Sequence, residues 1–252
     1  MLERFLERVA KSEYRDKYIL KGGFLISSMV GLDSRATMDM DATIKGYPVN
    51  EKMIQQMVDD IIAIDVGDNI HFDCYSVGLI REGDEYEGYR VALNAIYERM
   101  SVPLKLDITT GDKITPSEIL YPYKLMLENR SIYVLAYNLA TILAEKLETV
   151  ISRADQNTRS RDYYDIYILT KLQGQNIELE NLRSALDATS KKRGSTNLVK
   201  RYREIIEIVR QSDDMKYQWK KYTKSFHYAE TLEFDEVCKA VIAIMNKVME
   251  NE

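Results

Sequence analysis

The residues best suited to chemistry lie between Arg35 and Lys45, where polar and apolar side chains alternate strictly. Side chains of a strand point alternately to its two faces, so this segment predicts a strand over 35–45. The residues expected to face a core are Ala36, Met38, Met40, Ala42 and Ile44. The opposite face then carries Arg35, Thr37, Asp39, Asp41, Thr43 and Lys45.

Asp39 and Asp41 are two positions apart, which places their Cβ atoms about 6.5 Å apart on the same face of a strand. Two carboxylates about 4 Å apart repel by roughly 4 kcal/mol at an effective dielectric constant of 20. A divalent cation such as Mg²⁺ removes this repulsion and gains oxygen ligands. The alternative is a solvated sheet face with two unrelated acids, which a D-x-D spacing taken alone favours.

Asp107 lies in a second alternating segment, between the apolar residues Leu106 and Ile108. If this strand neighbours the first, three carboxylates meet on one sheet face. Such a triad can bind one or two Mg²⁺ for phosphoryl or nucleotidyl transfer. Asp107 could instead accept the proton of an attacking hydroxyl. Zinc is not expected, because the chain has two histidines, two cysteines and neither C-x-x-C nor H-x-x-x-H.

Lys21-Gly22-Gly23 precedes a segment, 24–30, that reads as a short helix ending at Gly31. Paired glycines let a phosphate approach the backbone, and the start of a helix offers unbonded N–H groups. The segment is not a P-loop, because no G-K-[ST] follows. A plain turn is the alternative.

Lys146 occupies an otherwise apolar stripe of a predicted helix, so it either extends to solvent or enters a cleft to bind phosphate. Asp162 and Asp165 follow, one helical turn apart. A surface ion pair between Arg161 and Asp165 is the simpler interpretation of that spacing.

The remaining pattern predicts an α/β front half and a helical back half. Helices are expected at 2–9, 24–30, 50–64 (capped by Asn50), 137–153, 159–172, 176–190, 197–211 and 233–250. Strands are expected at about 69–80, 86–97 and 102–110, with a hairpin-like turn, REGDEYEG, between the first two. We therefore predict two domains, 1–135 and 136–252.

Composition narrows the class of protein. The chain has 252 residues, a net charge of −5 and only two cysteines, which argues against a secreted disulfide scaffold and favours the cytoplasm. The longest uncharged stretch, 131–144, is too short and too polar to cross a membrane. Residues 181–225 carry 12 basic and 5 acidic side chains. With Tyr202, Tyr217, Trp219 and Tyr222 they could hold RNA, although such rings are more often core residues.

Taken together, these motifs resemble the AbiEii-type nucleotidyltransferase toxins. LKGGFLISSMVGLDSRATMDMDATIK is similar to the family's LKGG-x-x-L and R-x-[ST]-x-D-x-D blocks. Lys105-Leu106-Asp107-Ile108 with Gly111-Asp112 resembles the next block. Glu145-Lys146-Leu147, Arg153 and Arg161-Asp162-x-x-Asp165 resemble the later ones. The resemblance covers residues 1 to about 170.

The resemblance implies an α+β fold, in which a polymerase-β-like nucleotidyltransferase domain with a mixed sheet precedes an all-helical C-terminal domain. It implies a Mg²⁺-dependent toxin of a type IV toxin–antitoxin (abortive infection) system. The enzyme would transfer a nucleotide from an NTP, GTP or another, to RNA, most plausibly the 3′ acceptor end of tRNA, and so block translation. The cognate antitoxin carries a winged helix.

The resemblance also implies roles for individual residues. Gly22 and Gly23 would contact the triphosphate, and Lys21, Arg35 and Thr37 are further candidates for nucleotide binding. Asp39 and Asp41 would hold Mg²⁺, with Asp107 as the third carboxylate. Lys146 would bind phosphate, and Asp162 or Asp165 would complete the site.

Three other functions stay open at this point. The acceptor could be a hydroxyl of a small molecule or of a protein. The chain could bind NTPs without turnover. It could also be an interaction protein whose acidic face has no catalytic role.

Overall fold

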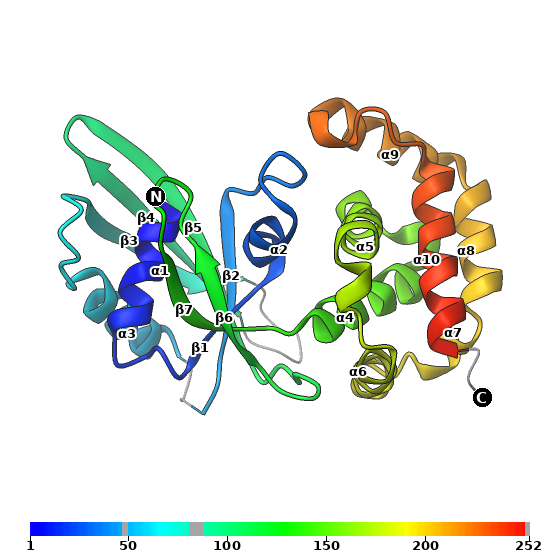
Figure 1. The fold of residues 1–252 in the computed structure, drawn as a ribbon, viewed down its shortest axis with the longest axis horizontal. Coiled ribbons are helices and arrows are strands. Elements are labelled where there is room, and N and C mark those ends of the chain that lie inside the picture. Colours follow the sequence, from blue (N-terminus) through cyan, green and yellow to red (C-terminus); the bar gives the residue numbers. More distant parts are fainter. Residues whose placement is uncertain (47–49, 81–87, 250–252) are drawn as a thin grey trace. The chain divides into compact units, whose positions relative to one another are not determined.

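The computed structural model describes residues 1–46, 50–80 and 88–249. These residues form two compact units (Figure 1). The first unit comprises Met1–Ser28, Ala36–Asp112 and Glu118–Tyr137, and the second comprises Met29–Arg35, Lys113–Ser117 and Asn138–Glu252. Two short segments of the first 135 residues thus belong to the second unit. The functional division at 135/136 stays a prediction.

The first unit is built on a seven-stranded sheet in the order β3-β4-β5-β2-β1-β7-β6. Its strands are β1 (Tyr18–Lys21), β2 (Asp39–Ile44), β3 (His71–Leu79), β4 (Gly88–Tyr97), β5 (Met100–Thr110), β6 (Ile119–Lys124) and β7 (Ser131–Ala136). The sheet is mixed, because β2 pairs parallel with β5 and β1 pairs parallel with β7, whereas the other neighbours are antiparallel.

The sequence predicted four of these strands, β2 to β5, and did not predict β1, β6 and β7. The strands expected near 69–80, 86–97 and 102–110 are confirmed as β3, β4 and β5. The hairpin-like turn between the first two falls at 81–87, outside the described residues. β6 and β7 were not predicted. β6 contains Pro122, which cannot donate to a ladder, and it is tolerated because β6 is an edge strand.

One face of the sheet, the core face, is apolar and covered by helices. Met40, Ala42, Leu106 and Ile108 on β2 and β5 are buried there. Helices α1 (Leu2–Lys11) and α3 (Glu51–Ile62) pack against this sheet and against each other (Figure 1). Asn50 caps α3 as predicted, because its side chain accepts a hydrogen bond from the Met53 N–H at 2.9 Å.

The opposite face, called here the polar face, carries the charged residues of the central strands. Lys21, Asp41, Asp107 and Arg90 share it, since they are direct register partners across β1, β2, β5 and β4.

Strand β2 is shorter than the predicted strand over 35–45. Met40, Ala42 and Ile44 face the core as expected, but Ala36 is exposed and Met38 is 76% exposed. Pairing explains the difference: β1 pairs only with residues 41–44, and β5 only with residues 39–44. Residues 36–38 therefore have no ladder to join, and Arg35 lies in the second unit rather than on the polar face.

The double glycine begins helix α2 (Gly22–Val30), so the expected helix after β1 is confirmed and starts two residues earlier than predicted. Gly22 has φ +66° and Gly31, after the last residue of α2, has φ +89°. Both values lie in the left-handed region that glycine adopts without steric cost.

The second unit is helical. Its helices are α4 (Leu139–Arg153), α5 (Ser160–Gln173), α6 (Leu179–Lys192), α7 (Thr196–Lys200), α8 (Tyr202–Gln211), α9 (Asp213–Ser225) and α10 (Phe234–Met249), with short 3₁₀ turns η1 (Ala154–Gln156), η2 (Gly174–Asn176) and η3 (His227–Ala229). Helix α4 packs against α5 and α6, and α10 packs against α5 and α8.

In the second unit, one predicted helix is wrong and one observed helix was not predicted. The single helix predicted over 197–211 is two helices, α7 and α8, which meet at Arg201. Helix α9 was not predicted, because charges occur on most of its sides and mask its apolar stripe. Tyr202, Trp219 and Tyr222 are buried, so they pack the interior and are not available to stack on RNA; Tyr217 is 60% exposed.

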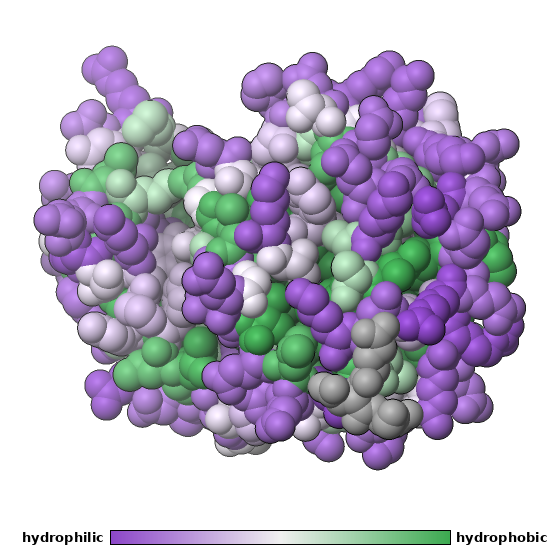
Figure 2. All heavy atoms as spheres, turned by 45° about the vertical axis from the view of Figure 1, so that its right-hand side comes forward, coloured by the Kyte–Doolittle hydropathy of each residue, from purple (hydrophilic) through white to green (hydrophobic). Residues whose placement is uncertain are grey.

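The predicted α+β class is confirmed: the mixed sheet is formed by residues 18–136, and the elements described after residue 138 are helices and 3₁₀ turns. Among the described residues, no helix combines the length and the apolar character that crossing a membrane requires. Figure 2 shows one face of the molecule, on which hydrophilic side chains predominate and hydrophobic ones form separate patches.

Candidate active site

A row of four charged residues crosses the polar face of the sheet. Arg90 on β4 is the register partner of Asp107 on β5, and Asp107 is the partner of Asp41 on β2. Asp41 is in turn the partner of Lys21 on β1. Direct partners have Cβ atoms about 5 Å apart, so two negative charges lie side by side between two positive ones. The predicted neighbourhood of the two acidic strands is confirmed.

Asp39 lies one row further along β2, on the same face as Asp41. It is exposed, and its register partner on β5 is Lys105. Thr37 precedes the strand, and its hydroxyl oxygen lies 3.4 Å from both the backbone N and the backbone O of Asp39. The strand thus carries two carboxylates on one side, as the spacing predicted.

Gly22 lies against the carboxylate of Asp41. A Cβ added to Gly22 would lie 2.1 Å from Oδ2 of Asp41 and 2.6 Å from its carboxyl carbon, far inside van der Waals contact. Only a residue without a side chain leaves room for Asp41 here. The same residue begins α2, followed by Gly23, so the carboxylate lies beside the N-terminus of that helix.

Asp107 is bound by Arg90 through both carboxylate oxygens. Arg90 donates from Nε to Oδ1 at 2.8 Å and from Nη2 to Oδ2 at 2.7 Å. These hydrogen bonds and the charge of Asp107 raise the pKa of Arg90, and the charges of Asp39 and Asp41 raise it further. The guanidinium therefore lies in the field of all three acids.

Lys21 is held by a polar cluster at the end of β5. Its ammonium donates to Oγ1 of Thr109 at 2.7 Å and to Oδ2 of Asp112 at 2.5 Å. The Tyr137 hydroxyl also donates to Oδ2 of Asp112, at 2.8 Å. Burial raises the pKa of Asp112, but Lys21 and the two hydroxyls hold it below its ordinary value. These hydrogen bonds hold the Lys21 side chain in place, and its register partner is Asp41.

The donor set of the polar face fits a hard divalent cation. Among the described residues, no three His, Cys, Asp or Glu side chains gather closely enough to hold a metal ion. Mg²⁺, however, is commonly bound by one or two carboxylates together with substrate phosphates. Asp39 and Asp41 supply two carboxylates, and the missing side chain of Gly22 lets the Asp41 carboxylate lie against the start of α2. The metal-binding role of Asp39, Asp41 and Asp107 stays a prediction.

Arg35 is not on the polar face, where the sequence placed it. Its side chain is 1% exposed and donates from Nε to Oδ1 of Asp165 at 2.7 Å within the second unit. Its predicted role in nucleotide binding stays a prediction, as does that of Thr37.

Lys146, Asp162 and Asp165 come together between α4 and α5. The ammonium of Lys146 lies 2.8 Å from Oδ1 of Asp162 and 2.8 Å from Oδ2 of Asp165. Burial lowers the pKa of Lys146, but the two carboxylates raise it above its ordinary value. The expected Arg161–Asp165 pair is wrong: Asp165 is buried and takes Arg35 and Lys146, and Arg161 lies over the ring of Phe226.

This buried network joins three segments of the second unit. Burial raises the pKa of Asp165, but Lys146 and Arg35 hold it below its ordinary value. Two cations and two carboxylates balance in charge, which is the condition for burying ions at tolerable cost. The catalytic role predicted for Lys146, Asp162 and Asp165 stays a prediction.

Sequence reasoning missed two residues that contact the predicted site. Arg90 lies on the alternating strand β4, but alternation does not reveal which acid it meets across the sheet. Asp112 was noted only as part of a Gly111-Asp112 motif, without a role. Its position three residues after Thr109 was the available signal.

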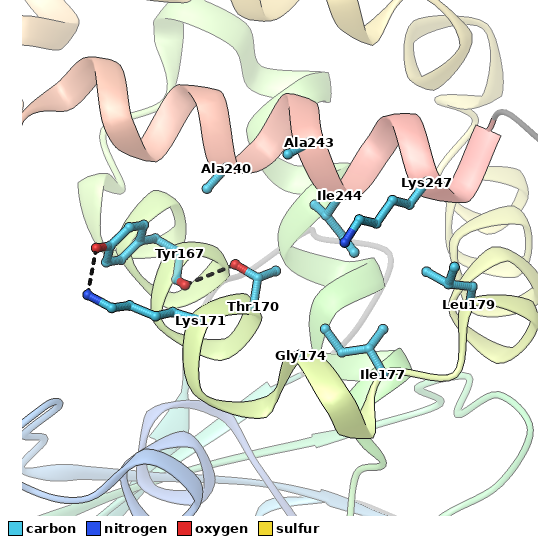
Figure 3. A pocket seen from close by; sticks show the side chains of 10 residues that line it. All are labelled: Tyr167, Thr170, Lys171, Gly174, Ile177, Leu179, Ala240, Ala243, Ile244 and Lys247. Carbon is cyan, nitrogen blue, oxygen red and sulfur yellow. Dashed lines mark hydrogen bonds between the residues drawn. The ribbon is translucent and has the colours of Figure 1, made fainter.

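The second unit also contains a cavity of about 350 Å³ (Figure 3). It is lined by Tyr167, Thr170, Lys171, Gly174, Ile177, Leu179, Ala240, Ala243, Ile244 and Lys247. Lys171 donates to the Tyr167 hydroxyl at 3.0 Å at one end of the cavity, and Lys247 extends from α10. None of the predicted site residues lines it.

The Asp165 network makes a prediction about stability. Asp165→Asn leaves Arg35 and Lys146 buried with less negative charge, so we expect a loss of about 3–5 kcal/mol in the free energy of unfolding at pH 7. The pKa of Asp165 is lower in the folded chain, so its charge stabilises the fold above pH about 4. Urea unfolding from pH 7 downward should show the two proteins converging as the pH falls below that value.

Asp187→Asn is the matched control, because Asp187 forms an exposed i,i+4 ion pair with Lys191 on α6. We expect it to change the unfolding free energy by less than about 1 kcal/mol. An Asp165→Asn protein as stable as this control would contradict the account of the network.

Comparisons with known proteins agree with the fold. JHP933 from Helicobacter pylori has a crystal structure that matches with a TM-score of 0.51 and 18% identity, over 99% of this chain and 90% of that chain. A second H. pylori structure, of a candidate nucleotidyltransferase, matches with a TM-score of 0.51 and 18% identity, over 100% and 94%. At this identity the likeness shows the fold alone. A comparison with curated proteins found no match.

The family comparison is the more informative one. Residues 4–240 match the family described as nucleotidyl transferase AbiEii toxin, type IV TA system. The match spans both units, the paired acids of β2 and the double glycine. The family is one of nucleotidyltransferases, and its toxin–antitoxin character implies a nucleotide substrate and an antitoxin partner. The chain therefore belongs to the AbiEii family of nucleotidyltransferase toxins of type IV toxin–antitoxin systems.

Proposed function

We propose that the polar face of the sheet binds an NTP with Mg²⁺ and transfers its nucleotide to RNA, at the 3′ acceptor end of tRNA. The observation that carries this proposal is the packing of Gly22 against Asp41, beside Asp39 on the same face of β2. A pair of strand carboxylates directly beside a glycine helix start suits a metal-bound triphosphate, because both the cation and the phosphates find ligands there.

The residues have separate tasks in this proposal. Asp39 and Asp41 would hold Mg²⁺, which when bound supplies charge neutralisation at the phosphates. The backbone N–H groups at Gly22 and Gly23 and the ammonium of Lys21 face the triphosphate. The acceptor hydroxyl forms a bond to the α-phosphorus, pyrophosphate leaves, and the hydroxyl proton passes to a carboxylate.

RNA is proposed as the acceptor because the motifs of this chain resemble those of AbiEii-type toxins, for which the resemblance implies an RNA target. Nucleotide addition to a tRNA end would block translation, and the toxin would act in the cytoplasm with a winged-helix antitoxin as its operon partner. GTP or another NTP is the donor. The basic side chains of 181–225 supply charge for an RNA backbone, although three of the four aromatic rings expected to assist are buried.

Removing either strand carboxylate tests the proposal. We expect Asp39→Asn and Asp41→Asn to abolish the transfer of labelled nucleotide from an NTP to RNA, because the cation loses half of its protein ligands. Both variants should relieve the growth arrest that expression of the wild-type chain causes. The assay is label incorporation into purified tRNA.

Asp73→Asn is the control, since Asp73 is an exposed carboxylate on the edge strand β3. It should transfer label as the wild-type protein does. If incubation with a cell lysate puts the label into a small molecule or into protein, the acceptor is not RNA. NTP binding without pyrophosphate release would make the chain a binding module. Unchanged transfer by Asp39→Asn would refute the mechanism.

The glycine contact gives a second test. Gly22→Ala places a methyl group where the Asp41 carboxylate lies, so we expect label transfer to fall about a hundredfold, as misplacement of a catalytic group by about 1 Å can cause. Gly46→Ala is matched, because Gly46 has φ +65° and a Cβ there would meet nothing within 4 Å.

In both variants the alanine must adopt a left-handed φ, which costs about 1–2 kcal/mol. Gly46→Ala therefore measures this strain alone, whereas Gly22→Ala adds the overlap with Asp41. Thermal unfolding should show a larger loss of stability in Gly22→Ala, and at a temperature where both variants are folded only Gly22→Ala should lose transfer. Equal activity of the two variants would show that Asp41 does not need its present position.

A further inference from the structure

Arg90 binds Asp107, one of the two carboxylates in the charged row of the polar face. Its two hydrogen bonds, at 2.8 and 2.7 Å, use both oxygens of Asp107. Such two-point contacts between a guanidinium and a carboxylate fix orientation as well as distance. The Arg90 side chain is 51% exposed and that of Asp107 is 22% exposed, so the pair is open to solvent and to a ligand.

This contact changes the donor set that the three acids offer to a cation. Asp107 is the register partner of Asp41, so their strand positions alone would allow both to bind one ion. Yet Asp107 is turned to Arg90, and the described residues contain no cluster of three metal-ligating side chains. The guanidinium also places a positive charge near Asp39 and Asp41, which disfavours a cation there unless phosphates offset it.

We propose that Arg90 is a positioning residue that holds Asp107 beside the metal site and not in it. The inference rests on the proposed function and deepens it. The ion is then held by Asp39 and Asp41 and completed by the phosphates of the nucleotide, so cation and nucleotide bind together.

Asp107 keeps a task of its own under this arrangement. A carboxylate offers about four lone-pair positions, and Arg90 uses two of them. The others can accept the proton of the attacking acceptor hydroxyl as its oxygen bonds to the α-phosphorus and pyrophosphate leaves. Arg90 orients this acceptor without contacting the reacting atoms.

The test is the affinity of the nucleotide-free protein for Mn²⁺, measured by electron paramagnetic resonance of the unbound ion. The affinity is compared in a double-mutant cycle of wild-type protein, Arg90→Gln, Asp107→Asn and the double variant. We expect Arg90→Gln to bind Mn²⁺ about tenfold more tightly, because Asp107 becomes a third ligand. Asp107→Asn alone should change the affinity less than twofold, and the double variant should lose the gain.

Lys105→Gln separates loss of charge from release of Asp107. Lys105 is exposed and is the register partner of Asp39, so its removal takes away a nearby positive charge without freeing a carboxylate. For the proposal to stand, Arg90→Gln must raise the Mn²⁺ affinity by more than Lys105→Gln does. Arg90→Lys keeps the charge but cannot make the two-point contact, so its Mn²⁺ affinity should be between those of the wild type and of Arg90→Gln.

Two results would overturn the proposal. One is a loss of Mn²⁺ affinity in Asp107→Asn as large as that in Asp39→Asn, which would make Asp107 a ligand with Arg90 in place. The other is an Arg90→Gln affinity no higher than that of Lys105→Gln. Neither result depends on transfer activity, so failure to detect label in RNA would count against the proposed function and leave this inference to be decided by Mn²⁺ binding.

Discussion

Repulsion between carboxylates on one sheet face is the constraint around which the first unit is organised. Asp41 and Asp107 are direct partners on parallel strands, and Asp39 lies one row away. Two such charges about 4 Å apart cost roughly 4 kcal/mol at an effective dielectric constant of 20. Arg90 compensates Asp107, and Lys21 completes the row on the other side. The other pair, Asp39 and Asp41 on β2, lies beside the glycine start of α2, where the proposed cation would add positive charge.

In the second unit the electrostatic constraint is a buried carboxylate. Asp165 is buried among helices, and it is tolerable there because Arg35 and Lys146 both reach it. Arg35 comes from residues 29–35, a segment that leaves the first unit and returns only three residues before Asp39. The chain that carries the paired acids is therefore anchored in the helical unit immediately upstream of β2. Between this anchor and β2, residues 36–38 have no pairing partner on β1 or β5, so the alternating pattern there does not form a strand.

The sequence was sufficient to predict features that depend on local pattern, such as the faces of strands and the start of a helix. Alternation placed Asp39, Asp41 and Asp107 on exposed sides of strands whose other sides carry Met40 and Leu106, and the glycine pair marked the start of α2. The local pattern could not predict contacts that depend on the register or packing of segments distant in the sequence. The Arg90–Asp107 contact needs β4 and β5 paired in one register, and the Arg35–Asp165 contact joins residues 130 positions apart. Helix α9 was hidden because its charges surround the apolar stripe.

The central claim is that Asp39 and Asp41 together bind a divalent cation with a nucleoside triphosphate. A crystal grown with Mn²⁺ and a non-hydrolysable triphosphate analogue, with anomalous diffraction data, locates the metal directly. The account predicts an anomalous peak within bonding distance of both β2 carboxylates and of the phosphates, with Arg90 still bound to Asp107. A peak elsewhere on the chain, or a triphosphate bound away from Gly22 and Gly23, would contradict it.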